Sequence, residues 1–187
     1  MLSRIAESLY WIGRYVERAE DTSRLLEVYL QLLVEDPSVD TRLSTVTLFA
    51  VLGMEPPAGP VSSQEVLRTI QNHPTAACSI LASLGGGRES ARRARETVPP
   101  EMWESLNTTW NSVRTDELRR RRPLAALAFV RDRCVLISGI ADTTMSHDEG
   151  WQFLQLGRQL ERVDMMARLL LWVSANRRSM SAWNNAL

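Results

Sequence analysis

The sequence predicts an all-α protein, a multi-helix bundle in which two long, pseudo-symmetric helices carry a repeated Gly-Arg-x-x-Glu-Arg motif. Two further observations support this fold class. Apolar residues recur three and four positions apart over long stretches, and no run of alternating polar and apolar residues indicates a strand. We expect a single helical domain over residues 1–176 and a loosely ordered tail over residues 177–187.

The first long helix is predicted from Ser3 to Val34. Its apolar residues follow the spacing of helices that pack against other helices. These positions are Leu2, Ile5, Leu9, Ile12, Val16, Ala19, Ser23, Leu26, Leu30 and Leu33. Pro37 ends the helix, because proline lacks the backbone N–H that a further turn requires.

Shorter helices are predicted to follow. One covers Thr41–Leu52, and the next ends near Gln71 after a cap formed by Ser62 or Ser63. A third helical pattern covers Thr75–Thr97.

The run Gly85-Gly86-Gly87 lies inside this third pattern and predicts a break or kink there. Each glycine costs about 1 kcal/mol relative to alanine in a helix. Pro99 and Pro100 then open another helix, since proline is tolerated in a first turn.

The last two helices are expected over Leu124–Met145 and Asp148–Ser174. Ser146 stands three residues before Glu149, which is the spacing of a capping box. We therefore predict that Ser146 caps the final helix.

The strongest pattern is an internal match between Leu9–Leu26 and Phe153–Leu170, in which seven of the eighteen aligned positions are identical. The identical pairs are Gly13 and Gly157, Arg14 and Arg158, Glu17 and Glu161, Arg18 and Arg162, Arg24 and Arg168, Leu25 and Leu169, and Leu26 and Leu170. The apolar positions repeat as Phe153, Leu156, Leu160, Val163, Ala167 and Leu170. We expect the two helices to lie side by side and to share one buried apolar seam.

The charged residues of the repeat form the candidate ligand or partner site. They are Arg14, Glu17, Arg18, Glu20, Arg158, Glu161, Arg162 and Asp164. The first interpretation is an ion-pair network that fixes helix register, with Arg14 pairing with Glu17 or facing Arg18, Glu20 with Arg24, Arg158 with Glu161, and Asp164 with Arg168.

Two other interpretations of the same residues stay open. The carboxylates of Glu17, Glu20, Glu161 and Asp164 resemble the acidic set of metal sites in helical bundles, although no histidine follows a glutamate by three positions. Alternatively, the arginines bind an anionic ligand. The sequence identifies no catalytic residue, and we expect no metal and no cofactor.

Composition narrows the function classes. The formal net charge is zero, which gives no general attraction to nucleic acid or to an anionic membrane. All 22 basic residues are arginine, so chemistry at a lysine amine is excluded. No apolar run is long enough for a membrane span and no signal peptide is recognisable, so we expect a cytoplasmic protein.

The repeated segments also carry a family resemblance. The stretches Met1–Glu20, Arg88–Arg92, Glu101–Asn107 and Asp148–Asp164 resemble the bacterial alpha-E domain family, and they cover most of the chain. The resemblance implies an all-helical protein whose gene accompanies an ATP-grasp ligase and a transglutaminase-like protein. Family members are commonly longer than this chain, so the resemblance leaves open whether it is a fragment or a short form.

Three functional hypotheses follow. The first is an accessory protein that holds an ATP-grasp-like ligase, a transglutaminase-like protein or a peptide substrate. The second is an enzyme that uses the clustered carboxylates, with or without a metal, in peptide modification or hydrolysis. The third is a structural homo-oligomer, because an uncovered part of the apolar seam would form an interface.

Overall fold

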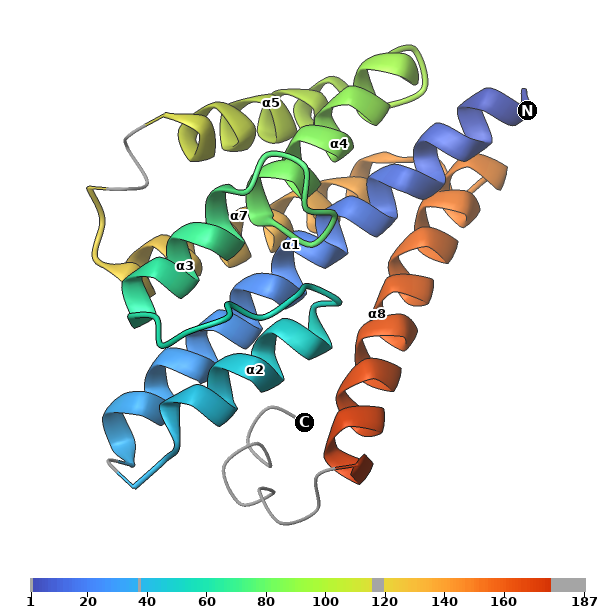
Figure 1. Cartoon of the computed structure of the whole chain (residues 1–187). Helices are drawn as coiled ribbons and strands as arrows, with labels where there is room; N and C mark the ends of the chain where they lie inside the picture. Colours follow the sequence, from blue (N-terminus) through green and yellow to red (C-terminus); the bar gives the residue numbers. More distant parts are fainter. Residues whose placement is uncertain (1, 37, 116–119, 176–187) are drawn as a thin grey trace.

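A computed structural model of the chain describes residues 2–36, 38–115 and 120–175. These residues form helices and no strands, which confirms the predicted all-α class (Figure 1). The helices are α1 (Ser3–Glu35), α2 (Thr41–Val51), α3 (Ser63–Asn72), α4 (Ile80–Arg93), α5 (Pro100–Arg114), α7 (Pro123–Thr144) and α8 (Glu149–Ala175). None of the helices in the described ranges combines the length and apolarity that a membrane crossing requires. The tail predicted over residues 177–187 lies outside the described residues.

Helix α1 is the central element, and it packs against α8, α4 and α7 (Figure 1). Its predicted apolar positions form the middle of the core. Leu9, Ile12 and Leu26 have no exposed surface, and Val16 is also buried. The predicted seam of the first helix is therefore buried over its central turns.

Several helix starts follow from local capping. The Asp40 side chain accepts a hydrogen bond from the Leu43 amide at the start of α2. Ser62 and Glu65 form a capping box at the start of α3, which confirms one of the two predicted caps. Pro100 occupies the first turn of α5, as predicted.

Helix α4 continues without interruption through Gly85-Gly86-Gly87, so the predicted break is wrong. The glycines instead make room for aromatic side chains of neighbouring helices. A Cβ atom on Gly86 would lie 2.8 Å from the ring of Tyr15, and one on Gly85 would lie 3.1 Å from Trp110 Nε1. Close packing against α1 and α5 offsets the intrinsic cost of glycine in the helix.

The cap of α8 also differs from the prediction. Asp148, not Ser146, accepts the hydrogen bonds of the first turn, from the Gly150 amide at 2.8 Å and the Trp151 amide at 3.3 Å. Asp148 stands directly before Glu149, the first residue of the helix, and this is the position from which a side chain reaches the free amides.

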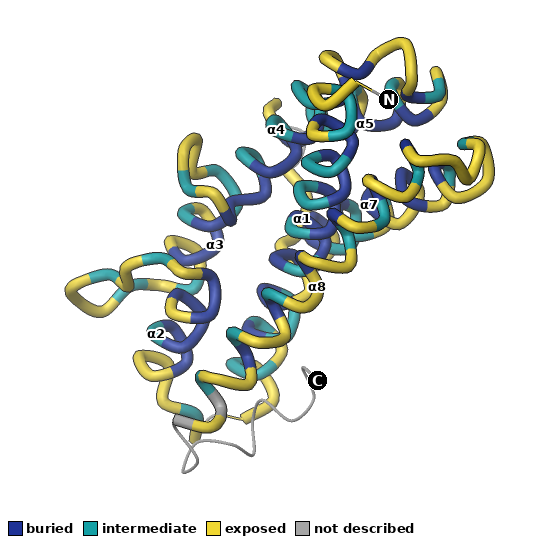
Figure 2. Tube along the Cα trace, turned by 90° about the vertical axis from the view of Figure 1, so that its right-hand side faces the viewer, coloured by how far each residue is buried: buried dark blue, intermediate teal, exposed yellow. Residues whose placement is uncertain are grey.

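The predicted apolar seam of α8 is not buried, which contradicts the expectation of one seam shared with α1. Leu156 is 48% exposed, Val163 64% and Leu170 50%. The described residues that α8 buries are Gly150, Leu154, Gly157, Glu161, Met165 and Leu169. The face that carries the glycine and the glutamate lies against α1, so the apolar seam is turned away from it (Figure 2).

Candidate functional site

The two motif helices touch at their glycines. A Cβ atom on Gly13 would lie 2.2 Å from the carbonyl oxygen of Leu154, and one on Gly157 would lie 2.0 Å from the carbonyl oxygen of Tyr10. Neither distance leaves room for a side chain. Gly13 and Gly157 therefore allow the backbones of α1 and α8 to come into contact, and the contact is reciprocal.

This contact brings the charged residues of the two motifs together. Glu161 is 2% exposed and accepts hydrogen bonds from two arginines of α1. Arg14 donates through Nε, and Arg18 donates through Nε at 2.6 Å and through Nη2 at 2.8 Å. The negative charge of Glu161 is thus held between two guanidinium groups, where bonds between charged partners are strong.

Glu17 is the counterpart of Glu161 and is equally buried, at 2% exposure. It accepts a hydrogen bond from Arg162 Nε, and Arg158 Nε lies 3.6 Å from its second oxygen. That oxygen and Arg158 Nε have no hydrogen-bond partner within the described part of the chain. Arg158 is also directed to α7, where its Nη1 donates to Asp142 at 3.1 Å. The two halves of the arrangement therefore match in topology and differ in strength.

These six residues are called the ion-pair cluster below: Arg14, Glu17, Arg18, Arg158, Glu161 and Arg162. The predicted pairs within one helix, Arg14 with Glu17 and Arg158 with Glu161, are wrong, because each arginine reaches across to the other helix. Because the helices are in contact at the glycines, the glutamates lie between the two helices. They therefore pair with arginines of the opposite helix and not with arginines of their own helix.

The other two predicted residues lie at the edges of the cluster. Glu20 accepts from Arg24 Nη2 at 2.6 Å, and Asp164 accepts from Arg168 Nη2 at 3.0 Å. Both pairs follow the predicted spacing of four residues within one helix. Asp164 also lies 3.7 Å from Arg14 Nη2, which connects this edge to the cluster.

Asp21 is a member of the site that the sequence did not single out. Burial, together with the nearby negative charges of Glu17, Glu20 and Glu161, raises the pKa of Asp21 to about 7. Its Oδ2 is buried without a hydrogen-bond partner among the described residues. The aligned position of α8 holds the apolar Met165. The sequence did contain one signal for this residue, because Asp21 is a third acidic residue that follows Glu17 and Glu20.

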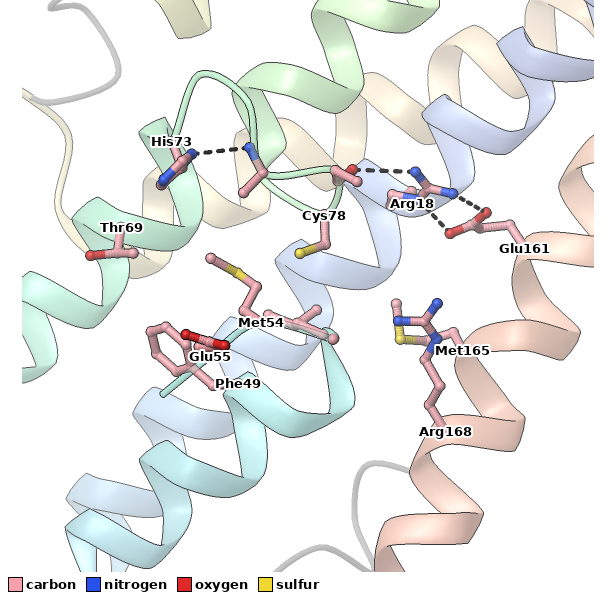
Figure 3. A pocket seen from close by; sticks show the side chains of 14 residues that line it. Arg18, Phe49, Met54, Glu55, Thr69, His73, Cys78, Glu161, Met165 and Arg168 are labelled. Atoms are coloured by element: carbon pink, nitrogen blue, oxygen red, sulfur yellow. Dashed lines mark hydrogen bonds and ion pairs between the residues drawn. The ribbon is translucent and has the colours of Figure 1, made fainter. Parts of the chain in front are cut away.

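A pocket opens beside the cluster, between α1, α2, α8 and the segment that precedes α4, and it has a volume of about 540 Å³ (Figure 3). Its polar side includes Arg18, Glu161 and Arg168. The residues that complete its lining are Phe49, Leu52, Gly53, Met54, Glu55, Thr69, His73, Ala76, Ala77, Cys78 and Met165. Sequence reasoning could not find this pocket, because its walls come from four separate segments.

Arg168 offers the pocket a free donor. Asp164 accepts from its Nε and Nη2, whereas Nη1 has no hydrogen-bond partner in the described residues and lies beside Gly53. The ring nitrogen Nδ1 of His73 is engaged by the backbone amides of Thr75 and Ala76. The pocket therefore contains the Nη1 donor of Arg168 next to apolar side chains.

The pocket and the cluster lack the features of a nucleophilic or metal centre. Burial raises the pKa of the Cys78 thiol, which keeps it in the unreactive protonated form. In the described ranges no group of three or more His, Cys, Asp or Glu side chains is arranged to hold a metal ion. The buried carboxylates of Glu17 and Glu161 are instead occupied by arginines.

The fold and the cluster define an all-helical protein whose central helices exchange buried Glu–Arg pairs. A family model matches residues 1–187, and the chain belongs to this family, Alpha-E, described as a predicted alpha-helical domain with a conserved ER motif. The chain contains two Glu-Arg dipeptides, Glu17-Arg18 and Glu161-Arg162, and both lie in the ion-pair cluster.

The chain is also similar to uncharacterised mycobacterial proteins. It is 25% identical over 191 residues to one from Mycobacterium bovis and to one from Mycobacterium tuberculosis strain CDC 1551. A protein of Mycobacterium tuberculosis strain H37Rv is 24% identical over the same length. The match covers 89% of this chain and 22% of each relative, so the chain spans only a part of these proteins. No solved structure matches the chain.

Proposed function

We propose that the chain is a helical binding protein that holds a peptide segment by a carboxylate and an apolar side chain in the pocket beside the ion-pair cluster. The observation that carries this proposal is Arg168, whose Nη1 lies at the pocket without a partner among the described residues while its other nitrogens are fixed by Asp164. A guanidinium oriented in this way is suited to a carboxylate.

The apolar wall supports a peptide rather than a small inorganic anion. Phe49 and Leu52 come from α2 and its C-terminal end, and Met54 and Met165 lie on either side of the pocket in Figure 3. Methionine side chains adapt to ligands of different shape because they are unbranched and polarisable. The pocket thus has room for a side chain next to the carboxylate.

The cluster itself supports a binding role over acid–base catalysis. A general acid or base must present its carboxyl group to a substrate. Glu161 has both oxygens bound by arginines, and Glu17 is 2% exposed and pairs with Arg162. The cluster therefore holds α1 and α8 at a fixed distance and so shapes the pocket.

The resemblance to the alpha-E family gives the proposal its biological setting. Its implied neighbours are an ATP-grasp ligase, which forms amide bonds, and a transglutaminase-like protein. The peptide that this chain holds would then be the substrate of that ligase or an exposed segment of the ligase itself. A carboxylate is the group that an ATP-grasp ligase activates, which agrees with the arginine donor of the pocket.

Fluorescence anisotropy with a labelled peptide that ends in a leucine carboxylate tests the binding site, with the same peptide amidated at its C-terminus as the comparison. We expect Arg168→Gln to weaken binding of the carboxylate by at least about tenfold, since a hydrogen bond to a charged group contributes roughly 1.5–3 kcal/mol. The substitution also removes the ion pair between Arg168 and Asp164, but this pair is exposed and contributes little to the stability of the fold.

The matched control is Arg92→Gln, which removes another exposed arginine from a pair, with Glu89 on α4, away from the pocket. It should leave binding unchanged. Equal binding of the acid and the amide, or equal binding by the Arg168→Gln variant, would contradict the proposal. A pull-down with the neighbouring ligase, under conditions where both proteins fold, tests the partner.

A further inference from the structure

The outward face of α8 is the largest concentration of exposed apolar side chains in the described part of the chain. In the described ranges thirteen large hydrophobic residues are exposed, and seven of them lie on α8. The other six lie on α1 or at its start, on α2 and on α7. Single exposed hydrophobic residues are ordinary, whereas a contiguous strip along one helix marks an interaction surface.

The strip has the spacing of a coiled-coil seam. Its members, called the α8 seam below, are Phe153, Leu156, Leu160, Val163, Ala167 and Leu170. They alternate three and four residues apart, and the pattern continues for more than four turns of the helix. Leu160 is 40% exposed and Val163 is 64% exposed, so the middle of the seam is open.

The same seam on α1 shows what such a pattern does when a helix covers it. Leu26 aligns with Leu170, and Ile12 aligns with Leu156. Both α1 residues have no exposed surface, because α4 and α7 also pack on α1. Among the described residues, helix α8 packs mainly on α1 and α2, and its seam residues are exposed (Figures 1 and 2).

We infer that the α8 seam is the interface of a homodimer, in which it packs against the α8 seam of a second copy in antiparallel orientation. The two-fold axis would pass between Leu160 and Val163. Leu160 then faces Val163 of the second copy, Leu156 faces Ala167 and Phe153 faces Leu170. Every seam residue meets another seam residue, and the symmetry repeats each pair twice.

The flanks of the seam favour a second copy over a partner of opposite charge. The flanking positions Gln152, Gln159, Met166 and Leu171 carry no charge. Asp164 is the charged exception, and it pairs with Arg168 of its own helix. Identical surfaces repel each other when they carry like charges, and a charge-selected partner needs opposite ones. This face has neither feature.

The inference is independent of the proposed peptide pocket. Residues of α8 that line the pocket, among them Met165 and Arg168, are not members of the seam. A variant of the seam should therefore keep peptide binding, and a variant of the pocket should keep the association state. The two proposals fail separately.

Sedimentation velocity of the full chain, from low micromolar to near-millimolar concentration, tests the interface. We expect a reversible dimer, and we expect the double variant Leu160→Glu with Val163→Glu to sediment as a monomer over the whole range. Both residues are exposed in the monomer, so the helical circular dichroism should not change. If this variant fails to fold, Leu160→Ser with Val163→Ser provides the same test.

The matched control is Val135→Glu with Leu136→Glu on α7, where the side chains are 50% and 44% exposed. It should dimerise like the parent chain. A parent that sediments as a monomer at every concentration overturns the inference. So does a dimer that survives the α8 variant, or one that the α7 variant abolishes.

Disulfide trapping tests the register. Proteins carrying Leu160→Cys and Val163→Cys are mixed and oxidised, and the antiparallel arrangement predicts that the mixed dimer forms faster than either self-dimer. The chain's own thiols do not interfere, because Cys134 is fully buried and Cys78 is 8% exposed. Preferred cross-linking of Leu160→Cys with itself would indicate a parallel pair and would overturn the proposed arrangement.

Discussion

Helices α1 and α8 carry the same sequence pattern in different surroundings. Leu26 of α1 is completely buried, whereas the aligned Leu170 of α8 is 50% exposed. Helix α1 has α4, α7 and α8 around it, whereas the principal contacts of α8 within the described residues are with α1 and α2. The comparison shows that an apolar seam gives a helix a face that is able to pack against other helices. The arrangement of the other helices decides whether that surface is covered.

The ion pairs of the two helices differ in the same way. Glu161 of α8 accepts three hydrogen bonds from α1, whereas Glu17 of α1 accepts one from α8. The difference arises because Arg158 also donates to Asp142 of α7, while Arg14 and Arg18 both donate to Glu161. The contact with a third helix, α7, thus makes the otherwise reciprocal ion pairs of α1 and α8 unequal.

The largest expected effect comes from Glu161→Gln. The substitution leaves Arg14 and Arg18 without their buried counter-charge, and removing one partner of a buried ion pair costs about 3–5 kcal/mol. Glu17→Gln should cost less, because Glu17 accepts fewer hydrogen bonds. Urea denaturation of both variants measures the difference. An equal loss of stability would show that the two halves of the cluster are equivalent.

The pair Leu26→Ala and Leu170→Ala compares the two apolar seams directly. Leu26→Ala opens a cavity in the core and should reduce the free energy of unfolding by about 2–5 kcal/mol. Leu170→Ala should change the stability of the monomer by less than about 0.5 kcal/mol, because half of its surface is already exposed. Thermal unfolding at low protein concentration checks both. A large loss for Leu170→Ala would mean that the α8 seam is covered within one chain.

Asp21 of α1 should make the stability of the protein depend on pH. The aligned residue of α8, Met165, does not titrate and cannot have this effect. The pKa of Asp21 is raised from 3.8 to about 7, so the folded state binds a proton more tightly than the unfolded state. Its contribution to stability is therefore present at low pH and is lost as the pH rises from about 4 to about 7.

The Asp21→Asn variant should accordingly gain about 4 kcal/mol over the parent chain at pH 8, since each pKa unit corresponds to about 1.4 kcal/mol, and it should gain little near pH 4. Denaturation curves of the two proteins across this range provide the measurement. Parallel stability profiles would exclude a raised pKa for Asp21.

The glycine contact should produce a smaller loss. Gly13→Ala places a methyl group against the backbone of α8, and such overpacking typically costs about 1–3 kcal/mol. The control is Gly139→Ala on α7, where a Cβ atom meets nothing within 4 Å. That substitution should stabilise the protein by about 0.5–1 kcal/mol through helix propensity. If Gly13→Ala and Gly139→Ala both stabilise the protein, the backbones of α1 and α8 can move apart without a loss of stability.

Much of the fold could be predicted because helices depend on local sequence. The spacing of apolar residues and the prolines placed α1 within one residue of its observed end, and Ser62 was predicted as one of two possible caps. The Gly-Arg-x-x-Glu-Arg repeat brought the six residues of the ion-pair cluster into one candidate site. These features are set by neighbours within about one helical turn, and the amino-acid order contains them.

What the sequence alone determined is thus a set of helices and the residues that could join two of them. The tertiary structure decided which arginine meets which glutamate, that Asp21 is half-buried among other acidic residues, and that the α8 seam faces outward. The physical reason is that charge pairing and burial depend on distances between helices. Those distances follow from the contact of Gly13 and Gly157 with the opposite backbone, which no local pattern specifies.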